Sequence, residues 1–216
     1  MGQSVEDIYN DVVDAGEDIY NDAVDAGEDL YNDAVDAGVD AGEYIADTSE
    51  DLFNAGVKAI KDLVRKEGGN GDDHIEIYAV GEGYGNGGND TLEAYALYVK
   101  LDGGSGNDTI KSNSGVSKLY GGSGNDSIEA WGAYNYIDGG SGNDTIKAHA
   151  AFNQIKAGSG DDYVEALGGY NDIDLGDGNN TVDAYGGKNK IVAASGDDNV
   201  DAWGGYNYVD LGDGNN

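Results

Sequence analysis

The nonapeptide GGSGNDTIK at residues 103–111 recurs almost unchanged as GGSGNDSIE at 121–129 and as GGSGNDTIK at 139–147. Further copies keep this spacing of 18 residues, and two irregular copies precede them: AGSGDDYVE at 157–165, LGDGNNTVD at 175–183, AASGDDNVD at 193–201, LGDGNN at 211–216, GGNGDDHIE at 68–76 and GNGGNDTLE at 85–93. A fixed period of this kind is the sequence signature of a solenoid, in which each repeat packs on the next.

A second type of nonapeptide alternates with the first. Its copies have a turn of small residues and an Asn at the sixth position: AWGAYNYID at 130–138, AHAAFNQIK at 148–156, ALGGYNDID at 166–174, AYGGKNKIV at 184–192 and AWGGYNYVD at 202–210. In both types a short strand with an apolar eighth residue follows the turn, so two nonapeptides form one flattened coil. The sequence therefore predicts that residues 67–216 are mainly β and form a right-handed parallel β-roll, a β-solenoid with 18 residues per coil.

Two columns of apolar side chains are predicted to fill this roll, one for each wall. The first consists of Ile110, Ile128, Ile146, Val164, Val182 and Val200, and the second of Leu119, Ile137, Ile155, Ile173, Ile191 and Val209. This core is thin, because one such side chain per strand does not outweigh the backbone entropy lost in ordering nine residues. Another interaction must hold the turns.

The acidic residue at the sixth position of the first nonapeptide type indicates what that interaction is. Calcium binds six to eight oxygen ligands at about 2.3–2.6 Å, and carboxylates together with the carbonyls of glycine turns offer such oxygens. The string G-G-x-G-x-D-x-U-x resembles the RTX nonapeptide family over residues 68–216. The resemblance implies several calcium ions stacked along one edge of the roll, each held between sixth-position aspartates of successive turns.

The candidate calcium residues belong to these turns. They are Asp73, Asp90, Gly103, Ser105, Asp108, Gly121, Ser123, Asp126, Gly139, Ser141, Asp144, Ser159, Asp162, Asp177, Asn180 and Asp198. The motif is broken at Asn180 and Asn216, where a neutral amide replaces the carboxylate. Asp177 and Asp213, at the third position, would compensate for this loss only in part.

The turns of the second nonapeptide type offer no sixth-position carboxylate. Their Asn135, Asn153, Asn171, Asn189 and Asn207 are expected to stack and hydrogen-bond along the roll axis, as ladders do in repetitive β structures. The same turns carry outward aromatic side chains that are expected to form an interaction strip: Trp131, Tyr134, Phe152, Tyr170, Tyr185, Trp203 and Tyr206. The chain's own helical segment, a helix of a neighbouring copy or a glycan could cover this strip.

Residues 1–66 follow a different period. EDIYNDVVDAG, EDIYNDAVDAG and EDLYNDAVDAG repeat every 11 residues and place apolar residues at helical spacing, which predicts an acidic amphipathic α-helical segment over 1–66. Lys58, Lys61, Arg65 and Lys66 cluster at its end, where the helix dipole favours cations.

Charge and composition narrow the function further. The net charge of −32, from 43 acidic and 11 basic residues, argues against nucleic acid or an anionic membrane as a partner and favours divalent cations. No apolar run approaches the roughly 20 residues of a membrane span, and MGQSVEDIYN lacks the features of a cleavable signal. The chain has no cysteine, and its two histidines, His74 and His149, occupy repeat positions, so no enzyme activity is expected.

The combined prediction is a non-enzymatic, calcium-binding structural protein, extracellular, secreted or at the cell surface: a subunit of a filament, matrix or surface layer. Its expected partners are other copies of itself, joined head-to-tail where the half-coil LGDGNN would complete a coil of the next copy. One alternative is an adhesin module that acts as a spacer or binds glycan. Another is an ice-binding roll that uses the serine row at Ser105, Ser123, Ser141 and Ser159.

Overall fold

The structure, a computed structural model, describes residues 65–78 and 80–216. Twelve strands make one sheet: β1 (Arg65–Glu67), β2 (His74–Ile77), β3 (Gly81–Gly87), β4 (Thr91–Ala94), β5 (Tyr98–Ser105), β6 (Thr109–Asn113), β7 (Val116–Ser123), β8 (Ser127–Ser141), β9 (Thr145–Ser159), β10 (Tyr163–Asp174), β11 (Thr181–Val192) and β12 (Asn199–Asp210). The helical segment predicted for 1–66 lies outside the described residues except for its last two.

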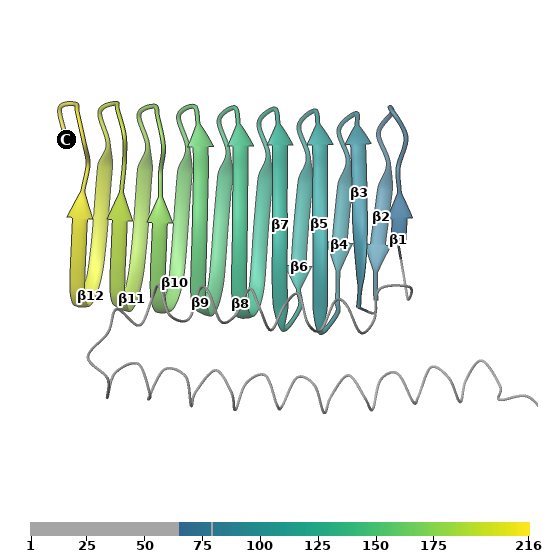
Figure 1. Cartoon of the computed structure of the whole chain (residues 1–216), viewed down its shortest axis with the longest axis horizontal. Helices are drawn as coiled ribbons and strands as arrows, with labels where there is room; N and C mark the ends of the chain where they lie inside the picture. Colours follow the sequence, from purple (N-terminus) through teal and green to yellow (C-terminus); the bar gives the residue numbers. More distant parts are fainter. Residues whose placement is uncertain (1–64, 79) are drawn as a thin grey trace, which may run out of the picture. The chain divides into compact units, whose positions relative to one another are not determined.

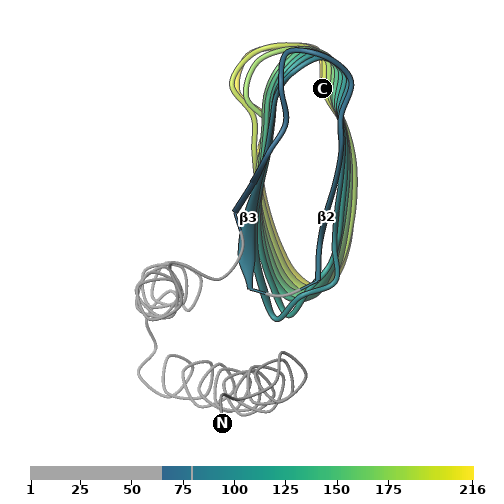
Figure 2. The same ribbon diagram turned by 90° about the vertical axis from the view of Figure 1, so that its right-hand side faces the viewer.

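The strands wind into a parallel β-solenoid of about eight coils (Figure 1). Strands β1, β3, β5 and β7 pair in one wall, and β2, β4 and β6 pair in the other. Strand β8 pairs with β6 through its first half and with β7 through its second, so it passes around one edge from wall to wall. Seen end-on, the coils overlie one another as a single flattened ring with β2 and β3 on opposite walls (Figure 2).

The register between strands confirms the 18-residue coil. Ile128 pairs with Ile146 on one wall and Ile137 with Ile155 on the other, so equivalent repeat positions stack directly. The two irregular copies belong to the same solenoid. Their coil is one residue shorter, because His74 pairs with Thr91, 17 residues on, whereas Thr91 pairs with Thr109.

The two predicted apolar columns are the core. All their members are buried except those of β12, the last strand, where Val200 is partly buried and Val209 is 43% exposed. A third inward column was missed in the sequence: Ala94, Ala130, Ala148, Ala166 and Ala184, which are at most 1% exposed. Alanine fits there because the flattened ring narrows towards its edge, and Ser112 takes the place in the coil where its hydroxyl meets that of Ser117 at 2.8 Å.

The predicted asparagine ladder is confirmed. Asn135, Asn153, Asn171 and Asn189 are buried, and each Nδ2 donates to the Oδ1 of the Asn in the next coil at 2.8–3.2 Å. The same amide groups also donate to turn carbonyls, such as that of Leu167 from Asn153 at 3.0 Å. The ladder begins with the Oδ1 of Asn135, which is buried and accepts no hydrogen bond from the described residues. We call this side of the roll the asparagine edge.

Arg65 and Lys66 are an exception to the sequence prediction, which placed them at the end of a helix. They lie in β1, an extended strand that pairs with β3. Extended pairing gives Arg65 two partners that a helix end would not supply: the guanidinium lies 4.5 Å from the centre of the Tyr84 ring and 3.7 Å from Glu82. Local charge pattern alone did not reveal these cross-strand contacts.

The substitution Asn171→Ala tests how much the asparagine ladder stabilises the roll. It removes an acceptor from Asn153 and leaves the Oδ1 of Asn189 buried without its donor, so the free energy of unfolding should fall by about 2–3 kcal/mol. The exposed residue Asn207 ends the same ladder, and Asn207→Ala should cost below about 1 kcal/mol. Urea unfolding of the calcium-saturated variants measures both values, and equal losses would contradict a stabilising role for the buried ladder.

Candidate metal centre

The turns opposite the asparagine edge carry the predicted calcium residues. We call this side, formed by the first nonapeptide type, the acidic edge; it lies at the top of Figure 1. The turns pack so closely on one another that only glycine fits at several positions. Gly106 has a φ of 122°, and a Cβ built on it would lie 1.8 Å from the carbonyl oxygen of Gly88 in the preceding coil. The conserved spacing of the glycines therefore sets the distance between successive turns.

The sixth-position aspartates form a ladder inside this edge. The Oδ1 atom of each one accepts a hydrogen bond from the backbone N–H of its counterpart in the preceding coil, for example Asp126 from Asp108 at 2.7 Å and Asp144 from Asp126 at 2.8 Å. The carboxylates are consequently turned inward, and Asp90, Asp108, Asp126, Asp144 and Asp162 are at most 3% exposed. Carboxylates this deeply buried require a counter-charge.

The second oxygen of these carboxylates has no partner among the described residues. The Oδ2 atoms of Asp90, Asp108, Asp126, Asp144, Asp162 and Asp198 are buried and accept no hydrogen bond. Asp73, in the first copy, differs because its Oδ2 accepts the N–H of Gly69 at 2.6 Å. A row of buried, unpartnered carboxylate oxygens is costly by itself and becomes favourable when a cation lies beside them.

The first-position glycines leave space for such a cation. A Cβ built on Gly103 would lie 2.3 Å from the Oδ2 of Asp108 and 2.6 Å from the carbonyl oxygen of Gly121 in the next coil. The same cradle of one carboxylate oxygen and one carbonyl oxygen recurs at four other glycines: Gly68, Gly85, Gly121 and Gly139. Hard oxygen ligands of both kinds are what calcium requires, so the residues present fit the ion that the resemblance implies.

Burial also changes the titration of these aspartates. It raises the pKa of Asp126 to about 7 and that of Asp162 to about 6, because the charged form is desolvated. Desolvation raises the pKa of Asp90, Asp108 and Asp144 in the same direction, against the hydrogen bond from the backbone of a neighbouring Asp, which lowers it. A bound divalent cation would favour the charged form instead.

A second ladder runs along the outside of the acidic edge and was missed in the sequence. The fifth-position side chains accept, through Oδ1, the backbone N–H of the next coil at 2.7–2.9 Å: Asn89, Asn107, Asn125, Asn143, Asp161, Asn179 and Asp197. These bonds point along the axis in the direction opposite to those of the sixth-position ladder. The invariant Asn or Asp at the fifth position was the signal that could have predicted it.

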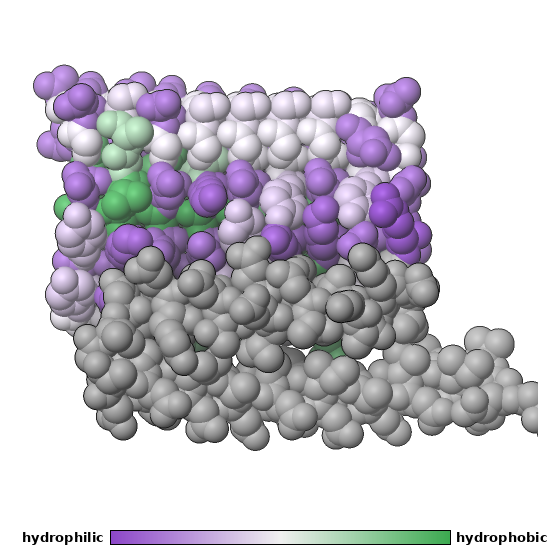
Figure 3. All heavy atoms as spheres, viewed as in Figure 1, coloured by the Kyte–Doolittle hydropathy of each residue, from purple (hydrophilic) through white to green (hydrophobic). Residues whose placement is uncertain are grey.

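The third-position serines lie farther from the cradle. Ser105, Ser123, Ser141 and Ser159 stack in register, and their side chains are exposed. Their carbonyl oxygens accept the N–H of the fourth-position glycine in the preceding coil, as Ser123 does from Gly106 at 2.8 Å. Their part in the edge is therefore to hold one turn on the next. Pale rows of glycine and serine mark this edge in the space-filling view (Figure 3).

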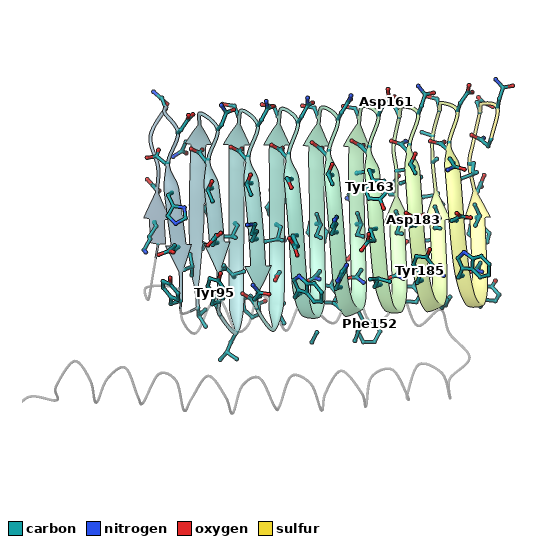
Figure 4. All side chains as sticks on the ribbon, turned by 180° about the vertical axis from the view of Figure 1, so that it is seen from behind. Tyr95, Phe152, Asp161, Tyr163, Asp183 and Tyr185 are labelled. Atoms are coloured by element: carbon teal, nitrogen blue, oxygen red, sulfur yellow. The ribbon has the colours of Figure 1, made fainter. Side chains whose placement is uncertain are left out.

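The predicted interaction strip divides into two columns on the asparagine edge. Trp131, Tyr185 and Trp203 belong to one column and are 45%, 43% and 64% exposed. In the other column, Tyr206 is 59% exposed, Tyr134 and Phe152 are half-buried, and Tyr170 is only 8% exposed. Figure 4 shows Phe152 and Tyr185 towards this edge and Asp161 at the opposite one.

Outside the acidic edge, one further group in the described part of the chain brings potential metal ligands together. His74, Glu76 and Glu93 have ligand atoms within 4.8 Å of one another on the outer surface of β2 and β4. His74 is exposed, and Lys111 lies 3.7 Å from Glu93 and neutralises part of its charge. These contacts account for the group as a set of surface ion pairs.

The fold and the row of inward carboxylates define a class: a parallel β-solenoid with the ligands for calcium along one edge. Five overlapping stretches match the family model described as the RTX calcium-binding nonapeptide repeat (4 copies): residues 84–118, 102–137, 112–146, 138–173 and 150–182. The repeats of residues 84–182 therefore belong to the RTX calcium-binding repeat family, as the resemblance predicted. No curated protein and no solved structure matches the chain. No helix within the described residues is long and apolar enough to cross a membrane.

The raised pKa values predict an inverted pH dependence for the metal-free protein. The pKa of Asp126 is near 7 in the folded chain and about 3.9 when unfolded, so the folded state binds more protons between these values and stability falls as pH rises from about 4 to about 7. The thermal midpoint in chelator should therefore be lower at about pH 8 than at about pH 5.

Two variants with the same change in charge separate this local effect from general repulsion. Asp126→Asn removes the buried titrating group and should flatten the pH dependence. Asp161→Asn, at the exposed fifth position where other coils have Asn, should leave it unchanged. Identical pH profiles for the two variants would contradict a contribution from the buried carboxylate.

Proposed function

We propose that this chain is a calcium-dependent structural protein of the extracellular space, a subunit of a filament, matrix or surface layer. The observation that carries the proposal is the row of buried, unpartnered Oδ2 atoms at the acidic edge. Each coil adds a further carboxylate to the row, so the stack gains electrostatic energy only when ions lie between the turns. Calcium is then part of the structure rather than of a reaction.

The net charge of −32 supports a location where calcium is abundant. Without counter-ions the carboxylates repel one another along the stack, and the thin apolar core offsets this repulsion poorly. Extracellular calcium modules bind at about 10⁻⁴–10⁻³ M, a concentration found outside cells. RTX repeats are typical of secreted proteins, which supports the same location.

The regularity of the stack supports self-association. Every coil pairs in parallel with the same register, so the surface at one end of the solenoid is complementary to the surface at the other end. A head-to-tail contact between two copies would repeat the contact between neighbouring coils, and such heterologous contacts propagate into filaments. Tyr208 and Val209 of β12, both more than 40% exposed, would be buried in this contact.

Calcium addition to the metal-free full-length chain tests this function. Circular dichroism should show strand formation at millimolar calcium, light scattering should show larger particles, and chelator should reverse both. Asp126→Asn should shift the calcium midpoint upward about tenfold, since an interaction with a charged group contributes about 1.5–3 kcal/mol. Asp161→Asn is the matched control and should leave the midpoint unchanged.

The outcomes distinguish the two parts of the proposal. Strand formation that is independent of calcium would refute the calcium-dependent structural role. Calcium-dependent folding without an increase in particle size would refute self-association and leave a rigid calcium-bound module.

A second candidate function, glycan binding by an adhesin module, is favoured by the exposed aromatic column. Trp131, Tyr185 and Trp203 offer ring faces along one line, and carboxylates stand beside them, as where Glu129 accepts the indole N–H of Trp131 at 3.0 Å. Aromatic faces beside hydrogen-bonding groups suit uncharged sugars.

Co-sedimentation with an insoluble neutral polysaccharide tests glycan binding. The calcium-loaded protein should sediment with the polymer, and the double substitution Trp131→Ala and Trp203→Ala should reduce the bound fraction at least about tenfold, because each ring contributes about 1 kcal/mol or more of contact energy. Asp161→Asn, on the opposite edge, should bind normally. Equal binding of the tryptophan variant and the wild type would rule out this surface.

A further inference from the structure

Two turns of the acidic edge depart from the others in a coordinated way. The turns Leu175–Asn180 and Leu211–Asn216 both read LGDGNN, whereas the turn Gly121–Asp126 reads GGSGND. The three differences are Leu for Gly at the first position, Asp for Ser at the third and Asn for Asp at the sixth. We call the two LGDGNN turns the leucine turns.

The first difference fills the cradle. A Cβ on Gly121 would lie 2.4 Å both from the Oδ2 of Asp126 and from the carbonyl oxygen of Gly139. Leu175 occupies the equivalent position, and its side chain is fully buried in the apolar core. The space that stays open beside Gly121 therefore holds an apolar side chain in the leucine turn.

The sixth-position difference removes the need for a cation. The Oδ1 of Asn180 accepts the N–H of Asp162 at 2.9 Å and so keeps the inner ladder intact. Its Nδ2 donates to the carbonyl oxygen of Gly178 at 3.1 Å, and the Nδ2 of Asn216 donates to that of Leu211 at 3.3 Å. Each amide thus bonds both ways within its own edge, where an aspartate leaves one oxygen unpartnered.

The third-position difference moves the carboxylate to the outside. Asp177 is exposed, and its Oδ1 accepts the hydroxyl of Ser195 at 2.6 Å. The backbone changes with it: Gly176 has a φ of 72° against 109° for Gly122, and β10 ends at Asp174 instead of continuing into the turn as β8 and β9 do. Figure 2 shows the C-terminal turns, in yellow, leaving the path of the others at this edge.

We infer that the leucine turns are closed by a leucine side chain and an asparagine amide in place of an inner calcium ion. Where calcium joins the carboxylate and carbonyl oxygens of the glycine-first turns, these two turns satisfy the same positions with groups of the chain itself. The roll then has a calcium-requiring part, from Gly68 to Asp144, and C-terminal turns that keep their shape without the ion. This inference rests on the proposed calcium-dependent function and assigns its sites.

Two reciprocal triple substitutions in the full-length chain test the inference. Leu175→Gly, Asp177→Ser and Asn180→Asp together convert the leucine turn into GGSGND. Gly121→Leu, Ser123→Asp and Asp126→Asn together make the opposite exchange. Each set leaves the net charge unchanged, so non-specific counter-ion binding is the same in both proteins and in the wild type.

Calcium bound per chain is measured by equilibrium dialysis, and the thermal midpoint is measured in chelator. The exchange at Leu175 should add at least one ion and lower the midpoint without metal, because a buried carboxylate is introduced. The exchange at Gly121 should remove at least one ion and raise that midpoint. If the Leu175 variant does not fold in chelator, its stoichiometry is read in saturating calcium, and the Gly121 variant gives the stability result.

Hydrogen exchange of the wild type gives a readout that needs no substitution. Calcium should strongly protect the backbone amides of residues 85–144 and should leave those of 175–180 nearly unchanged. Equal protection of both regions, or a stoichiometry that neither exchange alters, would overturn the inference while leaving the calcium function intact. A wild type that binds no calcium would instead refute the proposed function itself.

Discussion

The structure depends on the burial of carboxylates at the acidic edge. Their Oδ1 atoms are engaged by backbone amides of the preceding coil, which fixes the side chains inward and leaves the Oδ2 atoms facing the cradles beside the first-position glycines. The apolar core of one branched side chain and one alanine per strand pair is too thin to outweigh this cost in a chain of net charge −32. Metal binding and folding are consequently coupled in this architecture.

The two edges solve the same problem by different chemistry. Both must satisfy polar groups at the narrow ends of a flattened ring, where the chain reverses direction. The asparagine edge does so with neutral amides that donate and accept in one column, whereas the acidic edge uses acceptors only and so needs a positive charge from outside the chain. The leucine turns carry the amide chemistry over to the acidic edge.

Much of this arrangement could be predicted from the sequence because a strict repeat converts one local decision into many. The 18-residue period, the columns of Ile128 and Ile137, the asparagine ladder and the inward aspartates all follow from it. The period does not reveal which of two adjacent polar side chains points inward, so the ladder at the fifth position and the outward carboxylate of Asp177 were missed. Nor does it reveal side-chain packing between coils, which leaves Tyr170 buried in a column predicted to be exposed.

The asparagine ladder gives the roll a direction. Every Nδ2–H from Asn135 to Asn189 points towards the next coil, so the amide dipoles add head to tail, and each strengthens its neighbour through polarisation. A coil inserted in the middle of such a row is then worth more than a coil at its end. Repeat number becomes a means of tuning rigidity: gene duplications that lengthen the array would stiffen it disproportionately, and deletions would soften it, with no change in any single side chain.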